Sequence, residues 1–320
     1  MKKVLGLLAV LALLCGTCIA AGAGTYPDRP ITLLTVFSPG GGSDSVHRLL
    51  EKYAKGIMPV PFVITYKTGA GGEFGWTELA DANPDGYFIG GVDLPHITLQ
   101  PMVRKPGTPG YRTDQLQPIA GLLIDPNCIM VNKNSKWRDF REFVEYARQN
   151  PGKVRAAIVG KLTGDHIFIL KFEKATGTKF NIIPYTGGPK VGPALQSGEV
   201  ECYFGSLSGH FRMDNTRCLA VGTPERYELA GDIPTLRELG VDVVSVKRRG
   251  LAGPRGMAPE HVAYLQNVIR KINDNPDYIE GMKKLGTLPV FQTAEEFGRE
   301  IREETLNSAE VLKSLGYGQK

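Results

Sequence analysis

The sequence predicts an α/β protein in which short, mostly parallel strands alternate with amphipathic helices. Three observations lead to this prediction: recurrent β-branched and aromatic runs, apolar residues at helical spacing between them, and turn residues at the boundaries. Such alternation is typical of sheets covered by helices on both faces. About 300 residues follow an N-terminal leader, which is enough for two domains with their own cores.

The first predicted elements are a strand, a helix and two further strands. Ile31 to Phe37 is rich in β-branched and aromatic residues, as strands are. Apolar residues then recur at helical spacing from Val46 to Tyr53. Strands are also expected at 62–66 and at 87–92, the second entered through the turn 83–86.

The alternation continues to the C-terminus. We expect a helix at 137–149 and strands at 128–131, 154–158, 182–185, 201–204 and 218–221. Pro259 suits the first position of a helix, and Thr293 with Glu296 forms a capping box before another. The basic run 247–249 is short and is typical of a solvated edge.

The N-terminus has the three-part layout of a secretory signal peptide. Lys2 and Lys3 precede an apolar run at 4–14, and small residues at 20–23 suit a signal peptidase. The apolar run is shorter than the roughly 20 residues that span a bilayer. We therefore expect export, cleavage near residues 20–25 and a periplasmic location, with residues 1–23 removed.

Charge and cysteine usage exclude several classes of site. The net charge of +5 falls to +3 without the two leader lysines, so no nucleic-acid partner is indicated. Cys128, Cys202 and Cys218 are widely spaced without a histidine pattern, which argues against zinc. Separate buried thiols are the main expectation, with a Cys202–Cys218 bridge as the alternative. No cofactor is expected.

The strongest local signal is the glycine-rich segment 37–44, Phe-Ser-Pro-Gly-Gly-Gly-Ser-Asp, between the first strand and first helix. Glycines allow close backbone approach to a ligand, and Ser43 is a plausible N-cap. The N–H groups at the helix start suit an anion. The segment lacks the P-loop and dinucleotide patterns, so a nucleotide is not indicated. The alternative is a plain turn in which Asp44 stabilises the helix dipole.

Further glycine or polar loops follow other predicted strands, at 68–72, 160–166, 185–188 and 206–208. The carboxyl ends of parallel strands lie at one edge of a sheet, where open α/β folds bind ligands. The sequence therefore predicts a binding site assembled from several loops.

The chain resembles the extracytoplasmic solute receptors of the tripartite tricarboxylate transporter family. The resemblance rests on an ordered set of motifs at 26–31, 37–44, 69–72, 84–87, 150–153, 184–188, 197–200, 232–235 and 250–254. It implies a two-lobed, periplasmic-binding-protein-like fold with a small carboxylate in the inter-lobe cleft. It also implies a monomer that serves the membrane subunits of such a transporter, and not an enzyme.

The resemblance divides the chain into lobe I at 24–124, lobe II at 125–240 and a return to lobe I with C-terminal helices at 241–320. The segments 37–44 and 163–166 correspond to the family's two glycine loops, and Tyr185 and Ser206 to the cleft wall of the second lobe. The candidate ligand-binding residues are Phe37, Ser38, Gly40, Gly41, Gly42, Ser43, Asp44, Gly71, Asp93, Thr163, His166, Tyr185 and Ser206.

Several positions depart from the family pattern. Asp93 follows the third strand, where it would repel an acidic ligand unless it pairs or protonates. Gly205 stands where Asp or Asn is frequent, and residues 66–68 differ from the family pattern ahead of the glycine segment 69–72. His96 is expected to be structural. His166 suits either a helix cap or a ligand contact, and the alternative for Tyr185 is packing between the lobes.

The segment 37–45 holds no Arg or Lys, and Lys161 is the only basic residue at 160–165. We therefore predict that backbone N–H groups and water hold most of the carboxylate. Two other functions are compatible with parts of the sequence: a ligand-presenting sensor subunit for a membrane kinase, and a hydrolase. The segment 205–209 does not suit a hydrolase, because Leu207 takes the central position of the nucleophile elbow.

Overall fold

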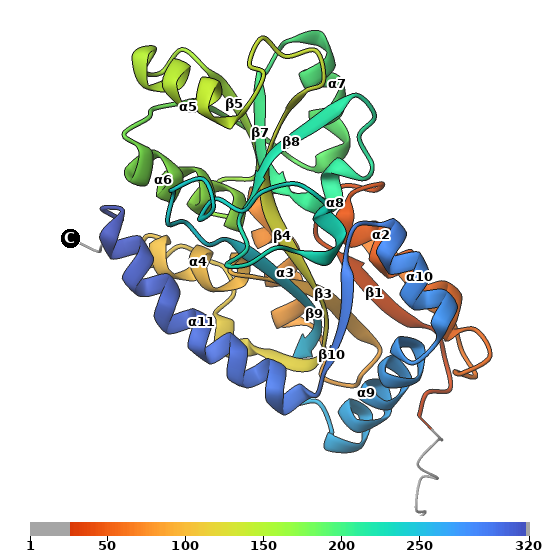
Figure 1. The fold of residues 1–320 in the computed structure, drawn as a ribbon. Helices are drawn as coiled ribbons and strands as arrows, with labels where there is room; N and C mark the ends of the chain where they lie inside the picture. The colour runs from red at the N-terminus through yellow and green to blue at the C-terminus, as the bar shows by residue number, and fades with distance from the viewer. Residues whose placement is uncertain (1–25, 318–320) are drawn as a thin grey trace, which may run out of the picture.

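The computed structural model describes residues 26–317. The predicted signal peptide lies outside the described residues. Ten strands form one continuous sheet system in the order β2-β1-β3-β9-β4-β7-β5-β6, with β8 and β10 also paired to β4. Figure 1 shows two lobes, with β1–β3 in the lower one, β5–β8 in the upper one and β4 running between them.

The first lobe contains β1 (Ile31–Thr35), β2 (Phe62–Tyr66) and β3 (Phe88–Leu94). β1 pairs in parallel with both β2 and β3. β9 (Val246–Pro254) is antiparallel to β3 and to β4 (Leu116–Asn132), and β10 (Leu288–Gln292) is antiparallel to β4.

The second half of β4 belongs to the second lobe, where it pairs with β7 (Cys202–Ser206) and β8 (Thr216–Val221) in antiparallel register. β5 (Arg155–Val159) is parallel to β7 and to β6 (Asn181–Tyr185). The α/β fold is confirmed, but the sheets are mixed and not mostly parallel. The reason is that β4 and β9 connect the lobes and run against their neighbours.

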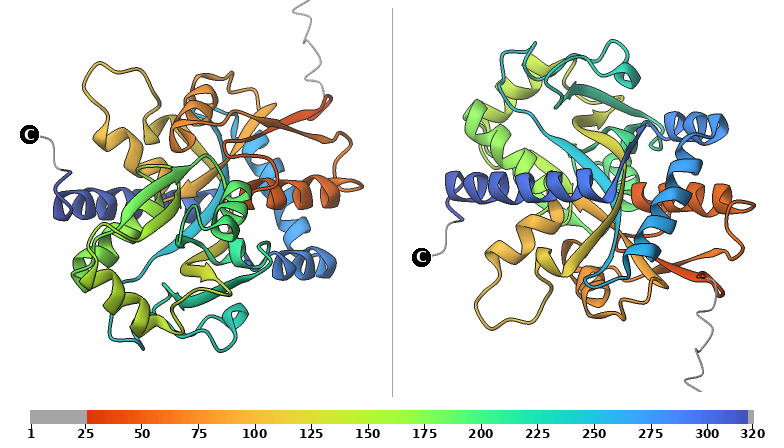
Figure 2. Two further views of the ribbon diagram at one scale, coloured as in Figure 1. Left: turned by 90° about the horizontal axis from the view of Figure 1, so that it is seen from above. Right: turned by 90° about the horizontal axis from the view of Figure 1, so that it is seen from below.

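Ten α-helices of the described chain cover the sheets. They are α2 (Gly42–Ala54), α3 (Glu73–Asp81), α4 (His96–Val103), α5 (Phe140–Gln149), α6 (Gly164–Thr176), α7 (Val191–Ser197), α8 (Leu207–His210), α9 (Pro259–Asn273), α10 (Pro276–Lys284) and α11 (Ala294–Ser314). Short 3₁₀ turns lie at Ala70–Gly72, Thr113–Gln115, Gly188–Lys190 and Glu228–Ala230. Figure 2 shows α11 crossing the molecule as one long helix.

Each lobe has its own hydrophobic core. In the first lobe, β1 and α2 pack with α9 through residues such as Leu33, Leu50 and Leu265. In the second, Phe143, Phe172 and Phe204 pack together with centroid separations of 5.3–6.5 Å. Burial of such large apolar side chains stabilises each lobe by roughly 1.5–3 kcal/mol per residue.

Most predicted elements are present, and two helix starts are confirmed in detail. Pro259 begins α9, and Thr293 forms a capping box with Glu296 at the start of α11. One N-cap prediction is wrong: α2 begins at Gly42, so Gly41 takes the N-cap position instead of Ser43. The Ser43 hydroxyl is directed to Asp93, at 3.5 Å, instead of the backbone.

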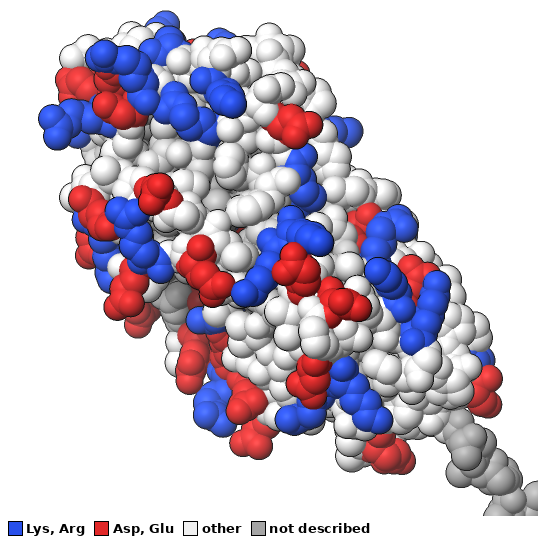
Figure 3. Space-filling model, turned by 45° about the vertical axis from the view of Figure 1, so that its right-hand side comes forward, with Lys and Arg blue, Asp and Glu red and all other residues white. Residues whose placement is uncertain are grey.

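The basic run 247–249 is part of β9 and is not a solvated edge. The surface in Figure 3 shows Lys and Arg interspersed with Asp and Glu, consistent with a small net charge. Cys128, Cys202 and Cys218 are free thiols, as mainly expected, but Cys218 is half-buried and not buried like the other two. Within residues 26–317, no helix has the length and hydrophobicity needed to cross a bilayer.

Candidate ligand-binding site

A small pocket lies between the lobes at the start of α2. We call it the cleft pocket; it has a volume of about 50 Å³ and is lined by Phe37, Gly41, Gly42, Ser43, Asp93, His96, Val159, Asp165, Gly187, Gly188, Tyr203, Ser206, Gly209, Arg212, Lys247 and Arg249. These residues come from both lobes and from β9, which connects them. The lining is rich in charged side chains and in glycines, so it suits a small polar ligand.

The glycine-rich segment brings backbone close to two guanidinium groups. A Cβ atom on Gly42 would lie 2.9 Å from Nη1 of Arg249 and 3.2 Å from Nη2 of Arg212. Only glycine fits there without displacing these groups. The start of α2, with its unpaired N–H groups and positive dipole end, therefore faces the same space as two arginines.

Asp44 holds the loop in shape. It accepts hydrogen bonds from Gly40 N–H at 2.7 Å, Tyr66 Oη at 2.7 Å and Arg48 Nε at 3.0 Å. Burial by itself would raise the pKa of Asp44, but these three donors together lower it below its ordinary value. The carboxylate of Asp44 is thus engaged by donors of the protein itself, and it lies outside the cleft pocket.

Strand alternation on β9 directs two cations into the cleft pocket. Lys247 and Arg249 are only 4% and 7% exposed, and Arg248 between them points to the opposite face and contacts Glu300. A strand places residues i and i+2 on one face. The run of three basic residues is therefore split between two environments.

Both β9 cations are paired with buried carboxylates. Arg249 Nη2 lies 2.7 Å from Asp125 Oδ2, and Lys247 contacts Asp165 and donates to Ser206 Oγ at 2.7 Å. Asp125 also accepts from Ser208 N–H and Oγ at 3.1 and 2.6 Å. Buried ion pairs of this kind are costly to break, because removing one partner leaves the other uncompensated.

Asp93 is held less tightly. Its nearest polar partners are Arg249 Nε and Ser43 Oγ, each at 3.5 Å, although the residue is only 5% exposed. Burial raises the pKa of Asp93, and the nearby Arg249 and Lys247 offset this only in part. Asp93 therefore retains capacity to accept a hydrogen bond from a ligand.

Among the cations that line the cleft pocket, Arg212 is the one that pairs with no carboxylate of the described residues. It follows α8, is half-buried and forms no ion pair with any residue of 26–317. Burial lowers its pKa from the ordinary value, with Asp125 acting in the opposite direction from a distance. Nη1 of Arg249 also has no hydrogen-bond partner within the described chain. Together these groups offer unused N–H donors beside Gly42.

Two buried histidines near the pocket are neutral. Burial lowers the pKa of His47 to about 4, and the ring Nδ1 lies 2.7 Å from Thr35 Oγ1. Burial and then Lys247 and Arg249 lower the pKa of His96 well below its ordinary value. Gly164 N–H donates to His96 Nδ1 at 3.4 Å, which agrees with the structural role expected for His96.

The predicted ligand-binding residues fall into four groups. Phe37, Gly41, Gly42, Ser43, Asp93 and Ser206 line the cleft pocket. Gly71 and Tyr185 line a neighbouring cavity of about 400 Å³, which Phe37 shares, and Gly40 lines another of about 340 Å³ beside α7. The phenol of Tyr185 donates to Glu199 at 2.6 Å.

The remaining predicted residues lie outside these cavities. Ser38 donates to Thr186 O at 3.3 Å across the cleft, and Thr163 is the N-cap of α6. His166 accepts from Leu162 N–H at 3.2 Å, and burial lowers its pKa to about 4. These contacts correspond to the helix-cap interpretation of His166.

Sequence reasoning missed Asp165, Arg212, Lys247 and Arg249, which line the cleft pocket, and Asp125, which pairs with Arg249. A usable signal was the apolar segment 250–254 after Lys247-Arg248-Arg249, because it extends these residues into a strand with two alternating faces. Arg212 had no local signal, since it lies in an irregular turn after a four-residue helix.

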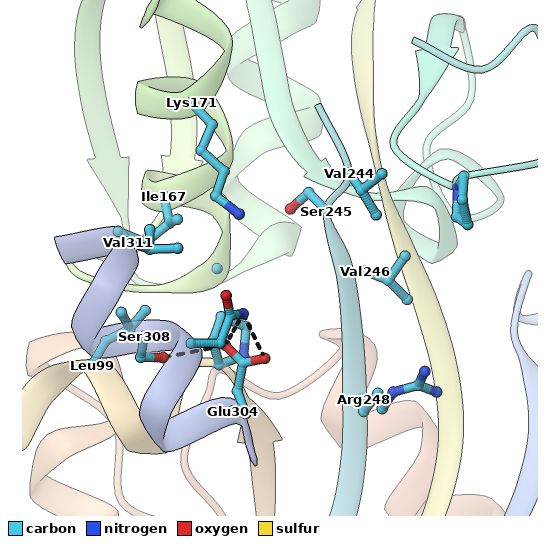
Figure 4. Close-up of a pocket in the computed structure, with 14 residues that line it drawn as sticks. Leu99, Ile167, Lys171, Val244, Ser245, Val246, Arg248, Glu304, Ser308 and Val311 are labelled. Atoms are coloured by element: carbon cyan, nitrogen blue, oxygen red, sulfur yellow. Dashed lines mark hydrogen bonds between the residues drawn. The ribbon is translucent and has the colours of Figure 1, made fainter. Parts of the chain in front are cut away.

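A second inter-lobe cavity of about 300 Å³ lies on the other face of β9, and we call it the back cavity. Its lining includes Pro95, Leu99, Ile167, Lys171, Val244, Ser245, Val246, Arg248, Glu304, Asn307, Ser308 and Val311. Figure 4 shows Lys171 extending from α6 and Glu304 from α11, where Glu304 accepts from Asn307 and Ser308. Its walls combine aliphatic side chains with charged and polar ones.

No group of three or more potential metal ligands occurs within residues 26–317. Residues 46–317 match the family model described as "Tripartite tricarboxylate transporter family receptor". The chain is 25% identical to protein BugT of Bordetella pertussis over 324 residues, which cover 99% of this chain and 98% of BugT.

Solved structures show the same fold. The periplasmic binding protein BugD is 25% identical and superposes with a TM-score of 0.85, covering 92% of this chain and 100% of BugD. MatC of Rhodopseudomonas palustris is 24% identical with a TM-score of 0.81, covering 90% of this chain and 100% of MatC. The two-lobed arrangement is therefore that of periplasmic binding proteins.

Proposed function

The chain belongs to the receptors of the tripartite tricarboxylate transporter family, and we propose that it captures a small organic acid in the cleft pocket and delivers it to the membrane subunits of such a transporter. Capture would take place outside the cytoplasmic membrane. We propose that the receptor is a monomer and performs no catalysis.

One observation carries the carboxylate part of the proposal. Two guanidinium groups with unused N–H donors, on Arg212 and Arg249, lie beside Gly42 at the N-terminus of α2. Guanidinium groups and helix N-termini both favour carboxylates, and charge-assisted hydrogen bonds contribute roughly 1.5–3 kcal/mol each. This revises the expectation that backbone N–H groups and water hold most of the carboxylate, because side-chain cations are also available.

Similar proteins bind such acids. MatC was solved with bound malate. At 24% identity that likeness shows the fold alone, so the case for a carboxylate here rests on the cleft pocket. We propose the six pocket-lining predicted residues, with Arg212 and Arg249, as the ligand contacts.

Export and lobe division are part of the same proposal. The leader at 1–23 supports secretion, and mass spectrometry of the exported protein should give an N-terminus between residues 21 and 26. A full-length N-terminus in the soluble fraction would contradict it. The separate cores support lobe boundaries near residues 124 and 240.

A thermal-shift screen of mono-, di- and tricarboxylates with the mature protein tests the function. At least one acid should raise the melting temperature and bind stoichiometrically by calorimetry. Binding without turnover supports a receptor, whereas conversion of the ligand would favour an enzyme. If no organic acid binds, the proposal is wrong. A sensor role would bind the same ligand, and it would be recognised by capture of a membrane kinase domain instead of the transporter subunits.

A further inference from the structure

The back cavity is separate from the cleft pocket and large enough for a small molecule. Its volume is about 300 Å³, which reaches the range of ligand pockets in proteins, and no residue lines both spaces. Strand alternation explains the separation, because Val246 and Arg248 face the back cavity whereas Lys247 and Arg249 face the cleft pocket. A molecule in the back cavity would therefore contact none of the residues proposed to hold the transported acid.

Part of the back cavity is aliphatic and is built by both lobes. Leu99 of α4 and Ile167 of α6 are 1% and 5% exposed and belong to one hydrophobic cluster, against which Val311 of α11 also packs. Val244 and Val246, at the start of β9, add to the aliphatic lining. Apolar surface of this kind favours a ligand with an alkyl chain.

The ammonium group of Lys171 is available to a ligand. It extends from α6 into the cavity (Figure 4), and it forms no ion pair or hydrogen bond with any residue of 26–317. Burial lowers the pKa of Lys171, and Glu304 acts in the opposite direction. A half-buried ammonium group without a protein partner favours an anion, because its three N–H donors are otherwise unused.

Ser245 supplies a further donor to the same cavity. Its Oγ accepts from Asn127 Nδ2 at 2.7 Å, so its own O–H remains for a ligand. The polar part of the lining therefore offers donors from two elements, α6 and the segment before β9.

The other charged groups of the lining are already engaged by the protein. Glu304 accepts from Asn307 Nδ2 at 3.1 and 3.2 Å and from Ser308 Oγ at 3.2 Å, and Arg248 contacts Glu300. The lining thus has unused donors, but its one carboxylate already has protein donors. This arrangement favours an acceptor group over an amine.

We propose that the back cavity is a second binding site, for a small aliphatic monocarboxylate. The carboxylate binds Lys171 and Ser245, and the alkyl chain packs on Leu99, Ile167 and Val311. A single charged end suits the cavity, because the lining next to the free donors is aliphatic or already bonded. The inference goes beyond the proposed function, which concerns the cleft pocket alone.

Short acids and their uncharged and cationic analogues test the second site. Butyrate, 3-methylbutyrate and hexanoate are each compared with the alcohol and the amine of the same carbon skeleton, by calorimetry on the mature protein. At least one acid should bind about tenfold or more tightly than both analogues, as expected for a charge-assisted hydrogen bond. If no acid binds more tightly than its alcohol, the inference is wrong, and the proposed function is still judged by the ligands of the cleft pocket.

Substitutions show which cavity the acid occupies. Lys171→Met should weaken binding of that acid at least about tenfold, whereas Lys153→Met, the control at an exposed lysine of the same lobe, should not. Glu304→Gln should not weaken binding, because it removes a like charge from the cavity.

Two results would overturn the second site. If Arg212→Gln abolishes binding and Lys171→Met does not, the acid occupies the cleft pocket, and the proposed function stands without the inference. Equal losses in Lys171→Met and Glu304→Gln would mean that both residues act on the structure and not on the acid. Circular dichroism of all variants checks that they fold.

Discussion

The two faces of β9 place the same kinds of residue in opposite situations. On the cleft face, Lys247 and Arg249 are buried and paired with buried carboxylates. On the opposite face, Arg248 borders the back cavity with a side chain that is 38% exposed and pairs with Glu300 near solvent. The difference shows that position along a strand, and not residue type, decides whether a cation is buried against a carboxylate or pairs near solvent.

The largest effect should come from Arg249→Met. It leaves Asp125, which is fully buried, and Asp93 without their guanidinium partner. We expect the free energy of unfolding to fall by about 3–5 kcal/mol in urea titrations. Arg248→Met, the matched change on the other face, should cost less than about 1 kcal/mol. Equal losses in the two variants would remove the distinction between the faces.

Arg212→Gln should affect binding more than stability. Arg212 has no ion pair in the described chain, so its loss leaves no carboxylate unpaired. Ligand affinity measured by calorimetry should fall about 10- to 100-fold, as expected for a charge-assisted hydrogen bond of roughly 1.5–3 kcal/mol. Lys161→Gln is the control, because Lys161 is exposed and lines only the neighbouring cavity. A stronger effect of Lys161→Gln would mean that the acid sits between the glycine loops instead.

The pH dependence of stability should contain a contribution from His47, which lies near the cleft pocket. His47 is neutral in the folded protein with a pKa of about 4, against about 6.5 when unfolded. Its contribution is complete above pH 6.5 and is lost as the pH falls towards 4, because only the unfolded chain takes up the proton. Between pH 7 and pH 5, the free energy of unfolding of His47→Gln should fall by about 2 kcal/mol less than that of the unsubstituted protein, as measured by urea unfolding. An unchanged slope would show that His47 titrates normally.

The smallest effect should come from the back cavity. Lys171→Met removes a half-buried ammonium that borders this cavity and not the cleft pocket. We expect the dissociation constant of the best ligand to change by less than about twofold and the melting temperature by less than about 4 °C. A large loss of affinity would mean that the ligand binds in the back cavity and not in the cleft pocket on the other face of β9.

The sequence was most informative where function depends on local pattern. The glycine-rich segment 37–44 predicts both the turn and the start of α2, and apolar spacing was sufficient to locate α9 and α11. The ion pairs were not predictable in this way. Arg249 and Asp125 are 124 positions apart in the sequence and meet only through the β4–β9 register. From the sequence alone, charged residues are expected at the surface, because the sheet order that buries them is not yet known.

β4 runs for seventeen residues through both lobes, and β9 lies along about its first two thirds, from Leu116 opposite Pro254 to Pro126 opposite Val246. Sliding this ladder by one residue would turn Lys247 and Arg249 to the other face, so shear between the strands is forbidden. Rotation of one lobe against the other must then be taken up as twist along a strand of about 55 Å. We therefore expect the strand pair to be stiff along its length and to twist about its axis, so that Lys247 and Arg249 stay on the cleft face when the lobes rotate.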